Sequence, residues 1–91
     1  MIRVVWTKDR LTLHGHADYA RRGEDIVCAA VSALTFALAG ALEQKGALRE
    51  LVIRSGYVTL AAQTGCEAEF SVARCGLGQL AAQYPECVNV E

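Results

Sequence analysis

The sequence predicts an α+β fold in which two helices pack on a mainly antiparallel sheet. The chain has 91 residues, enough for one domain and too few for two. Short apolar segments bounded by turn residues recur along it, as in β-hairpins. Two longer stretches place apolar residues at helical spacing. Together these observations predict the order ββαββαβ in a single domain over residues 1–91.

The first half of the chain predicts a β-hairpin, a loop and a long helix. Residues 2–6 and 11–15 flank a polar turn and form the hairpin. Residues 16–25 are polar and carry five charges, so we expect a loop there. An almost wholly apolar helix follows from Ile26 to about Lys45, and Gly46 is its expected stop. Because this helix is apolar nearly all round, we expect most of its faces to be buried.

The second half predicts the same elements again, followed by one more strand. Residues 51–62 predict a second hairpin. Thr64 and Glu67 have the spacing of a capping box, which predicts the start of a second helix running to Tyr84. Proline cannot continue a helix, so the helix ends before the single proline of the chain. Residues 87–90 then predict a last short strand.

The composition bears on which partners the protein binds. Nine Lys and Arg residues nearly cancel ten Asp and Glu residues, which leaves a net charge of −1. This balance gives no general attraction to nucleic acid or to an anionic membrane, so we expect neither as a partner. The longest apolar stretch, residues 26–42, is shorter than the roughly 20 residues of a membrane span. Apolar residues make up 53% of the chain, which a dense core or a subunit interface can bury.

The four cysteines are expected to be reduced thiols in the cytoplasm. None of them lies in a C-x-x-C pair, so a structural zinc site has no support. The N-terminal segment MIRVVWTKDR is too charged for a signal peptide, and a disulfide scaffold is therefore not expected. We expect no cofactor and no bound metal. The cysteines are Cys28, Cys66, Cys75 and Cys87.

Candidate chemistry concentrates in residues 15–34, where a strand ends, a charged loop follows and the apolar helix begins. If Asp25 is the N-cap, Cys28 lies in the first helical turn, where free N–H groups and the helix dipole favour a thiolate. The backbone N–H groups of this turn, including that of Cys28, are candidate oxyanion donors. His16 can face the helix start and act as general base and acid. The alternatives are a cysteine that only fills apolar space and a histidine that only caps its strand.

Asp25 and Ser32 have supporting roles in this scheme. Asp25 can accept the N–H of Cys28 as a helix cap or can orient His16, and capping is the favoured role. Ser32 lies four residues after Cys28 on the same helix face, within reach of a substrate or of His16. Alternatively, its hydroxyl donates to the carbonyl four residues earlier.

A zinc site is the main rival chemistry. His14 and His16 are two residues apart on a predicted strand and would share one face of it. Cys28 and Asp18 could complete a zinc shell, although this spacing is not diagnostic of one.

A long and unusual motif in this segment points to a known family. G-H-A-x-Y-A, a short loop with glycine and acidic residues, and D-I-V-C-A-A-V-S-A-L closely resemble the ribosomal-processing cysteine protease (Prp) family. The element order and the chain length agree with that family. The resemblance implies a bacterial cytosolic endopeptidase that removes a short N-terminal extension from a large-subunit ribosomal protein. A non-catalytic, ribosome-associated binding module is the alternative function.

The resemblance also implies roles for individual residues. The family's nucleophile falls on Cys28 and its histidine on His16, while its acidic and serine positions fall on Asp25 and Ser32. It further implies a homodimer and a mobile loop over residues 17–24 that covers the site. The precursor ribosomal protein is the implied substrate and partner.

Overall fold

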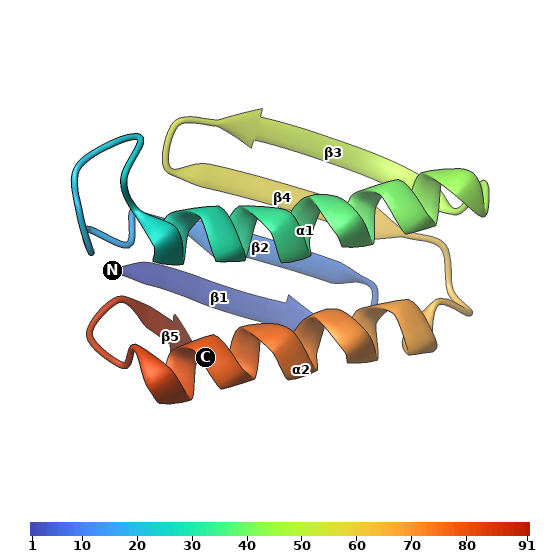
Figure 1. The fold of residues 1–91 in the computed structure, drawn as a ribbon. Coiled ribbons are helices and arrows are strands. Elements are labelled where there is room, and N and C mark those ends of the chain that lie inside the picture. Colours follow the sequence, from blue (N-terminus) through green and yellow to red (C-terminus); the bar gives the residue numbers. More distant parts are fainter.

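The computed structural model describes residues 1–91 and confirms the predicted α+β fold. The five strands form one sheet in the order β3-β4-β2-β1-β5, and only the β1–β5 pair is parallel. Both helices lie side by side over the same face of this sheet (Figure 1). The elements are β1 Ile2–Thr7, β2 Arg10–His14, α1 Ile26–Gln44, β3 Leu48–Arg54, β4 Tyr57–Ala62, α2 Glu67–Gln83 and β5 Val88–Val90.

The core lies between the two helices and the sheet. Leu11 and Leu60 of the sheet, with Leu42 of α1 and Leu77 of α2, are fully buried. Each such leucine contributes roughly 1.5–3 kcal/mol by leaving water. This packing holds α1 along the sheet, so its first turn lies at the end where β2 finishes and the β3–β4 turn begins (Figure 1).

Helix α1 ends as expected. Its C-cap is Lys45, and the Gly46 N–H donates to the Glu43 carbonyl at 2.9 Å. The Ala47 N–H donates to the Leu42 carbonyl at 2.8 Å, which completes a Schellman motif with a left-handed glycine.

The expectation that α1 is buried on most of its faces is wrong. Only its sheet-facing side is buried, because both helices cover one face of a single sheet and nothing packs on their outer side. By length and composition α1 is the one helix apolar enough to cross a membrane. Of its most apolar 18-residue segment, 33% is buried in the protein. The outer side carries a row of exposed apolar residues that we call the α1 stripe: Ile26, Ala29, Ala33, Phe36, Ala37 and Gly40.

The start of α2 also differs from the prediction. The N-cap is Cys66 and not Thr64, and no side chain caps this end. Gly65 has a φ of 98°, so the chain turns between Thr64 and the helix, and Glu67 becomes the first helical residue. Glu67 therefore cannot serve as the third residue of a capping box.

Strand β3 begins three residues earlier than expected, at Leu48 instead of Leu51. A β-bulge between Leu48 and Glu50 shifts the register against β4. The bulge breaks the alternation of apolar and polar side chains, which conceals this part of the strand in the sequence.

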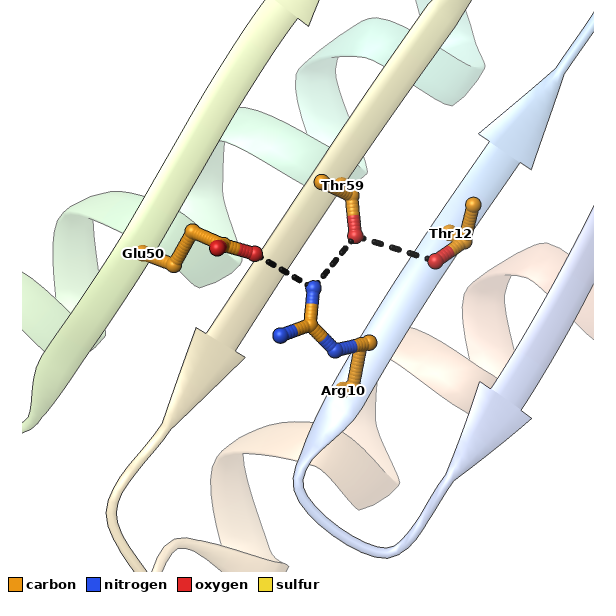
Figure 2. A network of polar contacts seen from close by, with 4 residues as sticks. All are labelled: Arg10, Thr12, Glu50 and Thr59. Atoms are coloured by element: carbon orange, nitrogen blue, oxygen red, sulfur yellow. Dashed lines mark hydrogen bonds and ion pairs between the residues drawn. The ribbon is translucent and has the colours of Figure 1, made fainter.

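The opposite face of the sheet is not covered by any helix (Figure 1). A polar network lies on it, in which the Arg10 guanidinium pairs with Glu50 and donates to the Thr59 hydroxyl at 2.9 Å (Figure 2). The Thr59 and Thr12 hydroxyls are 3.0 Å apart and share a hydrogen bond. These contacts join β2, β3 and β4 on the solvent side.

Candidate active site

A cavity of about 670 Å³ lies where the 15–25 loop, the start of α1 and the β3–β4 turn meet. His16, Asp25, Cys28 and Ser32 all line it, so the structure brings together all four predicted residues. The rest of the wall is mixed. Its apolar part includes Ala29, Phe36, Ile53 and Val58, and its charged part includes Asp18, Arg22 and Arg54.

Two glycines set the position of His16. Gly15 has a φ of 95°, and a Cβ there would overlap the Met1 carbonyl oxygen, so only glycine fits this turn out of β2. The Gly15 N–H donates to the Gly56 carbonyl at 2.8 Å, which ties the turn to the β3–β4 connection. A Cβ on Gly56 would lie 2.8 Å from Nε2 of His16. The imidazole therefore rests directly against the bare backbone of Gly56.

Asp25 caps α1, as favoured from the sequence. Its Oδ1 accepts the Cys28 N–H at 2.8 Å, and its Oδ2 accepts the N–H groups of Tyr19 at 3.0 Å and Ala20 at 3.3 Å. Both carboxylate oxygens therefore accept hydrogen bonds from backbone N–H groups, and His16 is not among their hydrogen-bond partners. The Cys28 N–H is occupied as well, so the expectation that it serves as an oxyanion donor is wrong for this structure.

The backbone contacts of Asp25 also lower its pKa. Burial acts to raise the pKa of this carboxyl, but hydrogen bonds from the N–H groups of Cys28, Ala20, Tyr19 and Val27 outweigh it. An ionised Asp25 therefore stabilises the folded start of α1 and the loop before it.

Replacing Asp25 with alanine is expected to lower the free energy of unfolding by about 1–2 kcal/mol at neutral pH, the cost of losing a helix cap. Asp25→Asn keeps the capping oxygen and is expected to lose less. Because the folded pKa is depressed, the charge contributes above the unfolded pKa of about 3.9 and is lost as pH falls through the folded pKa. Urea unfolding at several pH values measures this; a wild-type advantage over Asp25→Asn that grows in acid would contradict it.

Cys28 is half-buried, packs against the core and lines the cavity from the first turn of α1. Its side chain and that of His16 share the cavity without a mutual hydrogen bond, a common arrangement before a substrate binds. Ser32 lies one turn further along. Thr35 donates its hydroxyl to the Val31 carbonyl at 2.7 Å, whereas Ser32 makes no such bond and leaves its hydroxyl free on the cavity side.

The loop before α1 is anchored at several points. Besides the contacts to Asp25, the Tyr19 ring packs edge-on against Tyr84 after α2, with centroids 5.5 Å apart. The Glu24 N–H closes a turn on the Arg21 carbonyl at 2.9 Å. The loop forms one wall of the cavity, and the mobility expected of residues 17–24 stays a prediction.

The arrangement required by the zinc alternative is absent. Gly15 turns the chain, so His14 and His16 do not share a strand face. His14 packs edge-on against Tyr57, with centroids 5.1 Å apart, while His16 faces the cavity. No three potential ligands come together as a metal-binding group.

Comparison with known proteins decides the family. The sequence matches the family model described as cysteine protease Prp over residues 1–89. The chain belongs to the cysteine protease Prp family. It is 32% identical over 98 residues to the ribosomal processing cysteine protease Prp of Mycoplasma pneumoniae. The aligned region covers 100% of this chain and 94% of that protein. Membership in the Prp family makes this chain a cysteine peptidase.

Solved structures show the same fold. The structure of SMU.848 from Streptococcus mutans is similar with a TM-score of 0.77 and 28% identity, covering 100% of this chain and 92% of that one. The ribosomal processing protease Prp of S. aureus, solved in complex with a covalently linked product peptide, has a TM-score of 0.84. It is 19% identical and covers 99% of this chain and 95% of its own.

Sequence reasoning missed the contribution of the β3–β4 turn to the site. Residues 53–58 line the cavity opposite α1, and Gly56 supports His16. The local signal is a Ser-Gly dipeptide between two strands, which any ordinary hairpin carries. Only the sheet order, which places β4 next to β2, shows that this turn meets the end of β2.

Proposed function

We propose that this protein is a cysteine endopeptidase in which Cys28 is the nucleophile and His16 the general base and acid. The observation that carries the proposal is their shared cavity in a chain of the Prp family. The apolar walls and the open mouth of the cavity between loop and hairpin suit an extended peptide. Asp25 acts through the backbone, by holding the first turn of α1 and the loop that carries His16.

The reaction follows from these groups. His16 takes the proton of the Cys28 thiol, and Sγ attacks the scissile carbonyl carbon. The C–N bond then breaks, His16 protonates the leaving amine, and a thioester remains on Cys28. A water molecule gives a proton to His16 and attacks the thioester carbon, and the C–S bond breaks to release the acid. The leaving sulfur takes the proton back from His16, which restores the thiol. The free hydroxyl of Ser32, which lines the same cavity, donates a hydrogen bond to the substrate in this proposal.

We infer further that the substrate is a large-subunit ribosomal protein carrying an N-terminal extension, cut in the bacterial cytoplasm. Support comes from the names of the relatives, since the Mycoplasma pneumoniae protein is called a ribosomal processing protease. The test is incubation of the purified protein with the extended precursor and with the same ribosomal protein lacking the extension. Intact-mass spectrometry should show one cut that removes the extension, and no cut in the shortened protein.

Two outcomes would argue against this function. A precursor that co-elutes with the protein but stays whole would favour the non-catalytic binding module. Cleavage of unrelated unfolded proteins at the same rate would contradict a specific ribosomal substrate but would still agree with peptidase activity.

Replacing Gly56 with alanine is expected to lower kcat/KM for a peptide substrate about tenfold or more by displacing His16. The new Cβ would lie 2.8 Å from Nε2, closer than atoms pack, so the imidazole must move. Gly56 also has a φ of 68°, and a left-handed alanine costs about 1–2 kcal/mol in stability. Steady-state kinetics and urea unfolding measure the two effects separately.

Gly65→Ala is the matched control. Gly65 has a φ of 98°, and a Cβ added there would meet no atom within 4 Å. This variant therefore has the strain of a positive φ but no steric contact with a neighbouring side chain. Equal losses of activity in both variants would show that His16 does not depend on Gly56.

We also propose that the protein is a homodimer that buries the part of the α1 stripe outside the cavity: Ile26, Ala33, Ala37 and Gly40. Ile26 is 57% exposed, beside alanines that allow close approach of a second helix. An exposed apolar row of this kind is typical of an interaction surface, and a twofold axis would pair it with itself.

Replacing Ala33 and Ala37 together with arginine is expected to convert the dimer to a monomer, because like charges would then face each other across the axis. Light scattering coupled to size exclusion measures the mass. Val72→Arg is the control, since Val72 is 72% exposed on α2, outside the stripe. A monomeric wild-type protein, or dimers in all variants, would contradict the proposed interface.

A further inference from the structure

The face of the sheet that no helix covers carries a row of side chains crossing all five strands. Arg54 pairs with Tyr57, Tyr57 with His14, and His14 with Arg3. Asn89 of β5 follows as the partner of Arg3. Apart from the half-buried Tyr57, each of these residues is exposed, and we call the set the cross-sheet row.

The middle of the row is an aromatic platform flanked by cations. The rings of His14 and Tyr57 lie 5.1 Å apart, and the Arg54 guanidinium lies 5.9 Å from the centre of the Tyr57 ring. The next residues on this face of β4 and β2 are Thr59 and Thr12, which are small.

The row itself contains no acidic residue. Glu50 lies on the same face of β3 and is already paired with Arg10, as Figure 2 shows. Glu91 lies beyond Val90 at the outer edge of the sheet. The positive charge of Arg3 and Arg54 is therefore not cancelled within the row, although the whole chain has a net charge of −1.

The spacing of the two arginines selects the kind of anion. Arg54 and Arg3 lie on β3 and β1, three strand spacings apart, which is about 14 Å. An extended strand that carries several phosphates can contact both arginines at once. Guanidinium groups bind phosphate in a bidentate manner, and aromatic rings between them stack bases.

We propose that the cross-sheet row binds single-stranded RNA, about two or three nucleotides at a time, as an open sheet with exposed aromatic residues does. The arginines contact phosphates, the rings of Tyr57 and His14 contact bases, and Asn89 offers a hydrogen bond to a 2′-hydroxyl. The row lies on the face of the sheet opposite α1, and its residues Arg54 and Tyr57 also lie at the edge of the cavity. It does not rest on the proposed peptidase activity, and its failure would leave that activity standing.

The test is fluorescence anisotropy with a labelled single-stranded RNA of about eight nucleotides, measured from about 50 to 200 mM salt. The variant Arg3→Gln/Arg54→Gln is expected to bind at least about tenfold more weakly. The slope of log K against log salt should become shallower by about 1.4, since each phosphate contact contributes about 0.7 for a single strand. Lys45→Gln/Arg74→Gln removes the same charge from the helix layer and should change neither value.

Tyr57→Leu separates stacking from charge. It is expected to weaken RNA binding about tenfold while leaving the salt slope unchanged. Circular dichroism checks that each variant is folded. Absence of RNA binding by the wild type, equal losses in the helix-layer control, or equal binding of polyglutamate or of DNA of the same sequence would overturn the proposal.

Discussion

Replacing Cys28 with alanine is expected to abolish peptide cleavage while leaving the fold intact. Removing the nucleophile of a hydrolase that works through a covalent intermediate lowers kcat by about a million-fold in a well-studied serine protease. Alanine fits where Cys28 lies, because the side chain is half-buried and faces the cavity on one side. The free energy of unfolding should therefore change by less than about 1 kcal/mol. A quenched fluorescent peptide spanning the cut measures the activity.

The other cysteines provide the controls for this experiment. All four thiols are free, and Cys75 is exposed on α2, away from the cavity. Cys75→Ala should keep full activity. Cys28→Ser keeps the shape of the side chain but offers a much weaker nucleophile, so it should be as inactive as alanine in the same assay. Measurable turnover by the purified alanine variant would end the assignment of Cys28 as nucleophile.

The parts of this site that depend on neighbouring residues could be predicted from the sequence. Asp25 caps α1 and holds the Cys28 N–H because a cap contact spans only three residues. The end of α1 at Gly46 also depends only on hydrogen bonds between neighbouring residues. The capping box at Thr64 failed although it is also a local pattern, because Gly65 places a left-handed turn inside it.

Long-range features could not be predicted in this way. The contact between His16 and Gly56 depends on β4 lying beside β2, and the order of elements along the chain does not determine that pairing. The same pairing places His14 on Tyr57 and forms the cross-sheet row. Apolar periodicity did identify α1 as a helix, but it could not show that one layer of sheet leaves the outer side of that helix exposed.

Replacing His16 with glutamine is expected to lower kcat by about 10²–10⁴-fold, the usual contribution of a general base and acid. Glutamine keeps hydrogen-bonding groups at the position but cannot take the thiol proton or return it to the leaving amine. His16 is exposed and lines the cavity, so folding should be unaffected. The measurement is kcat with a short peptide substrate, in the absence of RNA.

His14, two residues before His16, provides a matched control. His14→Gln changes the same residue type on the open face of the sheet, where the ring packs on Tyr57, and should leave cleavage of a short peptide unchanged. His16→Ala, which leaves space beside Cys28 in the cavity, should regain part of its activity when imidazole is added. No such recovery is expected of Cys28→Ala, because imidazole can carry a proton but cannot replace the sulfur. If His14→Gln and His16→Gln lost activity equally, a general effect of histidine on the sheet would explain the result, and His16 would not be the base.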